Sequence, residues 1–156
     1  IALRAKHITT TAKLPHAWEF IHDEIGYNYR LSNINAALGY AQLEQLPAKL
    51  MTKRMLFKRY QDAFVPLEGA KLVVEPEQCS SNYWLQTIML NEDQVHQRDA
   101  ILQATNDAGF MTRPVWRLMH QLSPFTSCPR MDLTAAELLA QRLINIPSSP
   151  SLVDSV

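Results

Sequence analysis

The stretch HDEIGYNYRLSNINAALGYAQLEQL, residues His22–Leu46, places a loop of polar and aromatic side chains directly before a helix. From Leu31 to Leu38 the apolar residues recur at steps of three and four, which is the period of one helical face. We expect Ser32 to be the N-cap, because its hydroxyl can accept a hydrogen bond from a free backbone amide of the first turn. Pro47 should end or bend this helix, since proline lacks an amide hydrogen and its ring crowds the preceding turn.

A second long helix is expected after Pro47, and its apolar stripe consists of Leu50, Phe57, Tyr60 and Phe64. Proline and glycine then break the helical pattern at Pro66 and Gly69. We therefore predict two domains. Residues 1–65 would hold the end of a large domain and the long helices, and residues 66–156 a small C-terminal α/β domain.

The rest of the chain alternates strand-like and helix-like segments. Strands are predicted at 71–75, 82–90 and 143–147, where β-branched, aromatic or apolar residues cluster. A helix should run from 91–93 to Gly109, because glycine accepts the positive φ of a C′ position. The overall order predicts an α/β (α+β-like) fold, with two long helices followed by a small sheet covered by helices.

Two local sequence signals add detail to the secondary structure predicted for the C-terminal part. The segment MTRPVW should be extended, because the residue before Pro114 is disfavoured in the α region. Thr134 and Glu137 have the spacing of a capping box, which predicts the start of another helix.

Charge and cysteine content exclude several classes of function. The 15 Lys and Arg residues balance the 15 Asp and Glu residues, so no global field attracts nucleic acid or anionic lipid. Cys79 and Cys128 form neither a zinc motif nor a disulfide framework, so we expect a cytoplasmic protein. No apolar run approaches the roughly 20 residues of a membrane helix. The start at Ile1 and the abrupt C-terminal SLVDSV suggest a truncated chain.

The triplet Asn28-Tyr29-Arg30 is the first candidate binding site. An amide, an aromatic ring and a guanidinium precede a helix N-terminus, where free backbone amides and the helix dipole favour an anion. Arg30 could bind such an anion, most naturally a phosphate, with two hydrogen bonds. In the alternative, Tyr29 packs in the core and Arg30 pairs with Asp23 or Glu24.

The segment TRPVWRLMH is the second candidate, because Arg113, Trp116, Arg117 and His120 lie close to a proline. A guanidinium pairs with phosphate, and an aromatic face stacks on a planar ligand. In the alternative, Trp116 and Met119 fill a core and His120 caps a helix. Two further tryptophans, Trp18 and Trp84, are predicted to be core residues.

A metal site is not expected. The densest group of potential ligands matches no known ligand spacing and reads as a polar loop; its members are His16, Glu19, His22, Asp23 and Glu24. The sequence also lacks a P-loop, a dinucleotide-binding glycine motif and a nucleophile elbow.

The segment HAWEFIHDEIGYNYRLSNINAALGYAQLEQL closely resembles the DegT/DnrJ/EryC1/StrS family of sugar aminotransferases, fold-type-I enzymes that use pyridoxal 5′-phosphate. The resemblance continues, in order, through KRMLFKRY, SNYWLQTIML, TRPVWRLMH and AELLAQRLINIPSSP. TRPVW followed by LINIPSS looks most like the branch that acts on UDP-linked 4-keto-6-deoxy-N-acetylhexosamines in legionaminic-acid-type pathways.

The resemblance implies a homodimer that moves an amino group from glutamate to the C4 ketone of a nucleotide sugar. Asn28 would reach the cofactor phosphate of the neighbouring subunit, and Tyr29 and Arg30 would lie near the substrate. Arg113, Trp116 and His120 match the substrate-side loop, although many relatives carry a His-Tyr pair there. The Schiff-base lysine would lie upstream of Ile1, so no catalytic residue is assigned within the chain.

Two rival hypotheses remain open. In a dehydratase of the same superfamily, histidine replaces the Schiff-base lysine and the sugar loses a hydroxyl. In the other, the chain is a non-catalytic module for dimerisation or ligand binding.

Overall fold

The computed structural model describes residues 1–153, and these form two compact units. The first unit is Ile1–Leu46, and the second begins at Pro47. The long helix α3 (Leu46–Phe64) belongs to the second unit from Pro47 onward and packs against the sheet that follows it. The domains predicted at 1–65 and 66–156 refer to a longer protein and stay a prediction.

The first unit consists of α1 (Ala2–Thr9), a loop that folds back on itself, and α2 (Asn33–Glu44). Two isolated antiparallel bridges close the loop, Thr10 with Asn28 and Lys13 with His22. The two arms of the loop meet at Gly26, where a Cβ would lie 2.5 Å from the backbone nitrogen of Ala12. Only glycine therefore fits this crossing.

The predicted start and end of α2 are confirmed. The Ser32 hydroxyl accepts a hydrogen bond from the backbone amide of Asn35 at 3.4 Å, as an N-cap does. The helix ends at Glu44 and the next begins at Leu46, so Pro47 lies in a first turn, where its missing amide hydrogen costs no helical bond. No residue of α2 is buried within the described chain.

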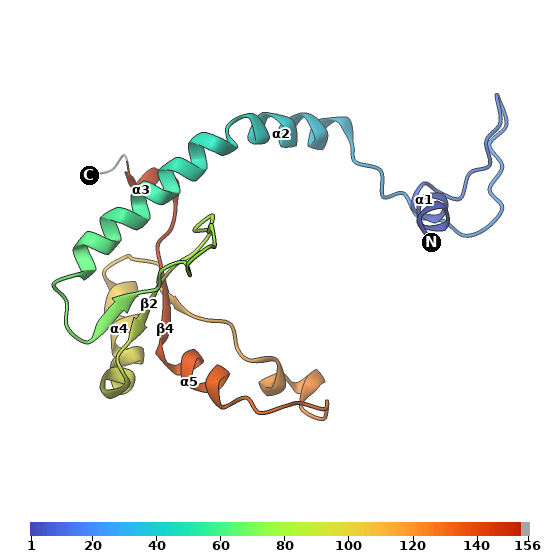
Figure 1. Ribbon diagram of the computed structural model, residues 1–156. Helices are drawn as coiled ribbons and strands as arrows, with labels where there is room; N and C mark the ends of the chain where they lie inside the picture. Colours follow the sequence, from blue (N-terminus) through green and yellow to red (C-terminus); the bar gives the residue numbers. More distant parts are fainter. Residues whose placement is uncertain (154–156) are drawn as a thin grey trace. The chain divides into compact units, whose positions relative to one another are not determined.

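The second unit is built on a four-stranded antiparallel sheet with the order β1-β2-β4-β3. The central strands β2 and β4 lie side by side in Figure 1. The bounds are β1 (Ala70–Leu72), β2 (Gln86–Leu90), β3 (Arg113–Pro114) and β4 (Leu143–Ile146). The predicted strands are thus confirmed in place, although β1 and β2 are shorter than expected.

Helical segments connect the strands. The helices are α4 (Arg98–Asp107) and α5 (Thr134–Arg142), and the short 3-10 turns are η1 (Glu92–Gln97), η2 (Met119–Gln121), η3 (Ser123–Phe125) and η4 (Pro150–Val153). Gly109 follows α4 with φ +84°, which confirms the predicted C′ glycine. Within the described residues, no helix is long and apolar enough to cross a membrane.

One face of the sheet forms the core. Its buried residues are Leu72, Ile88, Leu90 and Ile144, which pack against Phe57, Tyr60 and Phe64 of α3 and Ile101 and Leu102 of α4. The opposite face carries a polar row across three strands, in which Thr87 and Arg113 are both register partners of Asn145. The Thr87 hydroxyl donates to the Asn145 side-chain oxygen at 2.8 Å, which holds these two side chains of the row together.

Three predictions of packing and capping are wrong. Trp18 and Trp84 are not core residues, since their side chains are 77% and 64% exposed. Thr134 does not form a capping box with Glu137. Its hydroxyl and amide both donate to Asp132, at 2.7 and 3.2 Å, because the helix already includes Thr134 and the acceptor must come from before it.

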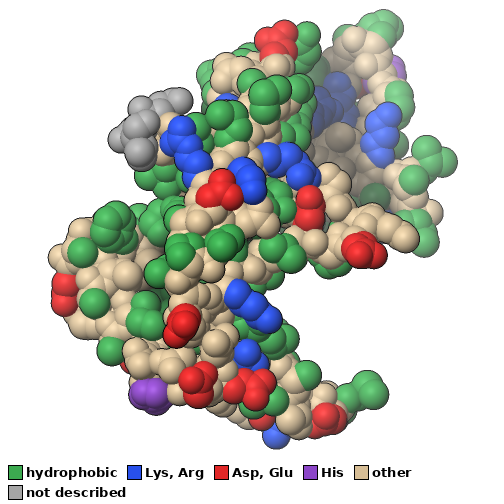
Figure 2. Space-filling model, turned by 60° about the vertical axis from the view of Figure 1, so that its left-hand side comes forward, with side chains coloured by type: hydrophobic (Ala, Val, Ile, Leu, Met, Phe, Trp, Pro, Cys, Tyr) green, Lys and Arg blue, Asp and Glu red, His purple; other side chains and the backbone are tan. Residues whose placement is uncertain are grey.

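Many apolar side chains lie on the surface. Figure 2 shows them on one face of the molecule, interspersed with basic and acidic groups. The most exposed in α2 and just before it are Leu31, Ile34, Leu38, Tyr40 and Leu43, between 61% and 82% exposed.

Candidate functional site

The backbone of the Asn28–Arg30 loop is fixed against the end of α1. The Tyr29 amide donates to the carbonyl of Thr9 at 2.9 Å, and the Tyr27 amide donates to the carbonyl of Ile8 at 2.7 Å. The rings of Tyr27 and Tyr29 stack with centroids 5.9 Å apart and planes within 10°. The loop is therefore held by its backbone while its side chains remain exposed.

The polar groups of this loop are free to bind a ligand. The Asn28 side-chain oxygen accepts from the Arg30 amide at 3.3 Å, and the Asn28 amide hydrogens have no partner among residues 1–153. Within residues 1–153 the Arg30 guanidinium has no hydrogen-bond or ionic partner. The alternative with a buried Tyr29 and a paired Arg30 is wrong, since Tyr29 is 74% exposed.

The acids that might have paired with Arg30 have other partners. Asp23 accepts from the His7 ring at 2.6 Å, and Glu24 pairs with Arg4 at 2.7 Å. The hydrogen bond from His7 lowers the pKa of the Asp23 carboxyl.

The densest group of potential metal ligands in the sequence does not converge as a set. His16 accepts from the Glu19 amide and His22 contacts the Thr11 carbonyl. Potential ligand atoms of His7, Asp23 and Glu24 do lie within 4.8 Å of one another. Sequence reasoning missed His7 in this cluster because the residue lies far upstream, on α1.

Arg113 and Trp116 come together in the second unit. The Arg113 guanidinium carbon lies 5.0 Å from the centroid of the Trp116 ring, and the Trp84 ring stacks near the same ring, with centroids 6.2 Å apart. Trp116 is 61% exposed, so the alternative that it fills a core is wrong. Arg113 also lines a hollow of about 810 Å³ with Asn145 and Ser148.

His120 lies at a different place. Its ring pairs with Glu137 of α5 at 3.0 Å, and it lines a separate hollow of about 380 Å³ with Phe125 and Cys128. Met119, which the alternative placed in a core, is 59% exposed. Arg113 and Trp116 thus form one cluster, and His120 belongs to another.

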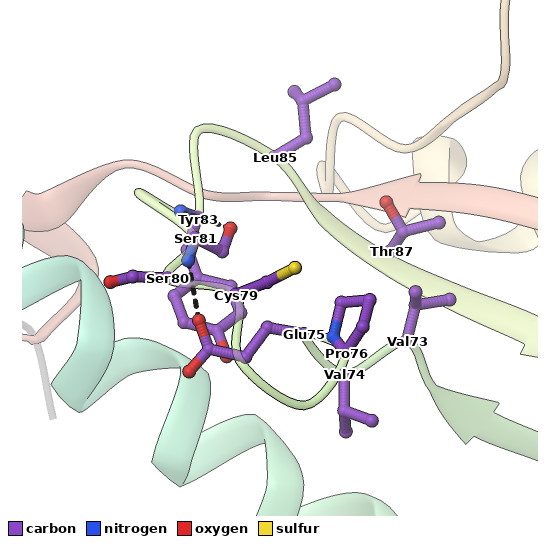
Figure 3. A pocket seen from close by; sticks show the side chains of 10 residues that line it. All are labelled: Val73, Val74, Glu75, Pro76, Cys79, Ser80, Ser81, Tyr83, Leu85 and Thr87. Carbon is purple, nitrogen blue, oxygen red and sulfur yellow. Dashed lines mark hydrogen bonds between the residues drawn. The ribbon is translucent and has the colours of Figure 1, made fainter.

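An ion pair shapes the loop between β1 and β2. Arg54 donates to both carboxylate oxygens of Glu75, at 3.0 and 3.2 Å, which raises the pKa of Arg54 and lowers that of Glu75. Figure 3 shows the Glu75 side chain pointing toward Ser81, whose amide donates to it at 2.6 Å. Glu75 and Ser81 border a hollow of about 270 Å³, which Thr87 of the polar row also lines.

The profile of the DegT/DnrJ/EryC1/StrS aminotransferase family matches residues 4–155 of the chain. The chain belongs to the DegT/DnrJ/EryC1/StrS family. It is 37% identical over 117 residues to EpsN of Bacillus subtilis (strain 168), an alignment that covers 75% of this chain and 29% of EpsN. It is 34% identical to the GDP-perosamine synthase of Escherichia coli O157:H7 over 86% of this chain and 35% of that protein.

A solved structure shares the fold. Helicobacter pylori PseC, an aminotransferase involved in the biosynthesis of pseudaminic acid, superposes with a TM-score of 0.85 at 19% identity. The superposition covers 98% of this chain and 43% of PseC. This DegT/DnrJ/EryC1/StrS chain therefore spans about a third of the length of these two curated relatives. Its fold matches part of the fold of a fold-type-I aminotransferase.

The DegT/DnrJ/EryC1/StrS family uses pyridoxal phosphate, and the free groups of the loop suit one part of that cofactor. Amide and guanidinium donors are the groups that bind phosphate oxygens. The ammonium group of Lys53 instead donates to the carbonyls of Trp84 and Ser148. The loop thus fits the phosphate of the cofactor, and Lys53 does not fit the role of its covalent anchor.

Proposed function

We propose that this chain is part of a cytoplasmic, pyridoxal phosphate-dependent aminotransferase. The enzyme would transfer an amino group from glutamate to the C4 ketone of a nucleotide-linked 4-keto-6-deoxy sugar. The observation that carries the proposal is a pair of donors, Asn28 and Arg30, which have no side-chain donor contacts in the described part of the chain and lie on an ordered loop directly before α2. Family membership supports the reaction class.

On the cofactor side, the chain contributes a phosphate contact. The free amide of Asn28 would donate to the cofactor phosphate of the neighbouring subunit in a homodimer. When bound, the cofactor supplies the electron sink for the transamination, whereas this chain binds and orients. The positive end of α2 adds a favourable field for a nearby anion.

On the substrate side, the cationic and aromatic groups would bind the nucleotide sugar. Arg30 can donate two parallel hydrogen bonds to a phosphate, and Tyr29 stands beside it. Arg113 and Trp116 offer a second cation and an aromatic face. His120, paired with Glu137, would contribute from its own hollow on the same substrate-side segment.

The finer proposal concerns the sugar. We infer a UDP-linked 4-keto-6-deoxy-N-acetylhexosamine of a legionaminic-acid-type pathway. The support is the resemblance of TRPVW and LINIPSS to that branch. The E. coli relative is named for a GDP-linked sugar, so a panel of UDP-, GDP- and TDP-linked 4-keto sugars is the appropriate test.

The experiment measures amino transfer from glutamate by the full-length protein across this panel, for the wild type and for Arg30→Ala, Arg30→Lys and Lys58→Ala. Arg30→Ala should lower kcat/KM roughly 10- to 100-fold, because a hydrogen bond to a charged group is worth about 1.5–3 kcal/mol. Arg30→Lys should recover part of the loss, since lysine keeps the charge without the planar fork. Lys58, which pairs with Asp62 on α3, serves as the control for removal of an exposed cation.

Three results would contradict the proposal. Unchanged kinetics of Arg30→Ala would remove Arg30 from the substrate site. Loss of a sugar hydroxyl without formation of an amine would identify the dehydratase instead. No turnover of any nucleotide sugar by the full-length protein would favour the non-catalytic module.

A further inference from the structure

Trp84 is directed to the surface by the residue before it. Tyr83 is 5% exposed, and its ring stacks on Phe57 of α3 with centroids 4.1 Å apart. The backbone of Tyr83 has φ +45°, a conformation that non-glycine residues rarely adopt. With Tyr83 turned into the core, the side chain of Trp84 lies outside and is 64% exposed.

The backbone of Trp84 is fixed on both sides. Its amide donates to the Asn82 side-chain oxygen at 3.0 Å. Its carbonyl accepts from the Lys53 ammonium at 3.1 Å and from the Ser148 hydroxyl at 3.0 Å. These contacts connect α3, the β1–β2 loop and the segment after β4, so the exposed ring has an ordered base.

Hydrogen bonds also fix the part of the β1–β2 loop that precedes Trp84. Besides its two bonds to Glu75, the Arg54 guanidinium donates to the Ser80 hydroxyl at 2.8 Å and to the Ser81 carbonyl at 2.7 Å. The Tyr83 amide donates to the Ser81 hydroxyl at 3.0 Å. An unfavourable backbone conformation persists only when its surroundings determine it, and such positions cluster at ligand sites.

The exposed ring of Trp84 is part of a stack. Trp84 and Trp116 lie with an interplanar angle of 29°, and the Arg113 guanidinium lies over Trp116. Within the described residues, neither indole N–H donates a hydrogen bond. The stack therefore offers an exposed flat π surface, unpaired donors at its edges and a cation.

We propose that Trp84 is a substrate-binding residue that stacks on the nucleobase of the nucleotide sugar, a role that rests on the function proposed above. Aromatic side chains stack on any base, because each base has a flat π face. The Arg113 guanidinium stands at the other end of the stack, where it would pair with the diphosphate that adjoins the base. Trp116 connects the two and keeps their spacing fixed.

The test measures ligand binding to the full-length holoenzyme by calorimetry, separately from turnover. The probes are UDP, GDP and TDP, with inorganic pyrophosphate as the ligand that lacks a base. The variants are Trp84→Ala and Trp84→Phe, with Trp18→Ala as the matched control, since Trp18 is also exposed and lies in the first unit.

Trp84→Ala should weaken binding of the preferred nucleoside diphosphate roughly tenfold, the order of effect found when a base loses its aromatic partner. Trp84→Phe should restore most of that affinity, because phenylalanine keeps a stacking face. Pyrophosphate affinity should not change in any variant, and Trp18→Ala should bind every probe as the wild type does.

Other outcomes separate this inference from the proposed function. If the wild type aminates a nucleotide sugar while Trp84→Ala binds nucleotides normally, the inference fails and the proposed function stands. An equal loss of nucleotide and pyrophosphate affinity would make Trp84 a structural residue and would also overturn the inference. A wild type that neither binds nucleotides nor turns over nucleotide sugars would reject the proposed function itself.

Discussion

A few individual charged residues determine the electrostatic interactions of the β1–β2 loop. Glu75 accepts hydrogen bonds from Arg54 and from the amide of Ser81, so its ionised form is favoured in the folded state. Arg54 in turn reaches Ser80 and the Ser81 carbonyl, which makes the ion pair the centre of a network. The orientation of Trp84 depends on this network through Tyr83.

Glu75→Gln should change how stability depends on pH. Because Arg54 lowers the pKa of Glu75 below its ordinary value of 4.5, the carboxylate contributes stability above that ordinary value. This contribution is lost as the pH falls through the lowered folded-state pKa. The free energy of unfolding of Glu75→Gln should be reduced at neutral pH and should fall less steeply below about pH 5 than that of the wild type.

Urea denaturation at a series of pH values measures this effect. Glu68→Gln is the control, since Glu68 is an exposed acid without a hydrogen bond or ion pair among the described residues. If Glu75→Gln and Glu68→Gln had the same pH profile, the network would not stabilise the fold.

The buried side-chain amide of Gln86 is expected to lower the stability of the fold. Gln86 is 1% exposed on the core side of β2, and neither its side-chain nitrogen nor its side-chain oxygen has a hydrogen-bond partner among the described residues. Gln86→Met keeps the approximate shape and should raise the free energy of unfolding by about 1–2 kcal/mol, because an unpaired buried polar group costs about 1–3 kcal/mol. Thermal and urea denaturation measure it, and a destabilised Gln86→Met would mean that the amide is paired in solution.

At the scale of elements, the folded-back loop of residues 10–28 depends on a close contact between its arms. A side chain at Gly26 would meet the backbone of Thr11 and Ala12 at 2.5 Å. Thr11 and Ala12 already have positive φ values of 70° and 50°, so that arm has little freedom to move. Two residues further along the same arm, Asn28 pairs with Thr10 in a separate antiparallel bridge.

Gly26→Ala should therefore destabilise the loop by about 1–3 kcal/mol, the usual cost of overpacking. Gly39→Ala is the matched control with the opposite sign, since a Cβ there meets nothing within 4 Å and alanine in a helix gains about 0.5–1 kcal/mol. Hydrogen exchange at the Tyr27 and Tyr29 amides measures the loop directly. Unchanged protection of these amides in Gly26→Ala would show that the contact is not needed.

The elements that sequence could predict are those with local causes. Ser32, Pro47 and Gly109 act through their own backbone or side chain, and all three lie where expected. The capping box failed because Asp132 competes for the same donors, which spacing alone does not reveal. The apolar neighbours of Trp84 predict a core position, and no local pattern indicates the positive φ of Tyr83 that turns Trp84 outward.

At the scale of the whole molecule, the side chains of both candidate sites are exposed to solvent. The donors of Asn28 and Arg30 belong to the first unit, and the stack of Trp84, Trp116 and Arg113 belongs to the second. The sequence pattern pointed to Asn28 and Arg30 at the first site and to Arg113 and Trp116 at the second, but it placed Trp84 in the core. The separation of His120 from Arg113 could not be predicted, because it depends on where β3 and α5 lie in the sheet fold.

The position of β4 has a consequence for biosynthesis. Asn145 pairs with Thr87 across the centre of the sheet, although 58 residues separate them in the chain. While the ribosome makes the intervening segment, β2 lacks one of its two neighbours and its edge is open to other chains. The sheet can close only after β4 has been synthesised, so the nascent chain passes through a stage at which chaperone binding would protect it from aggregation.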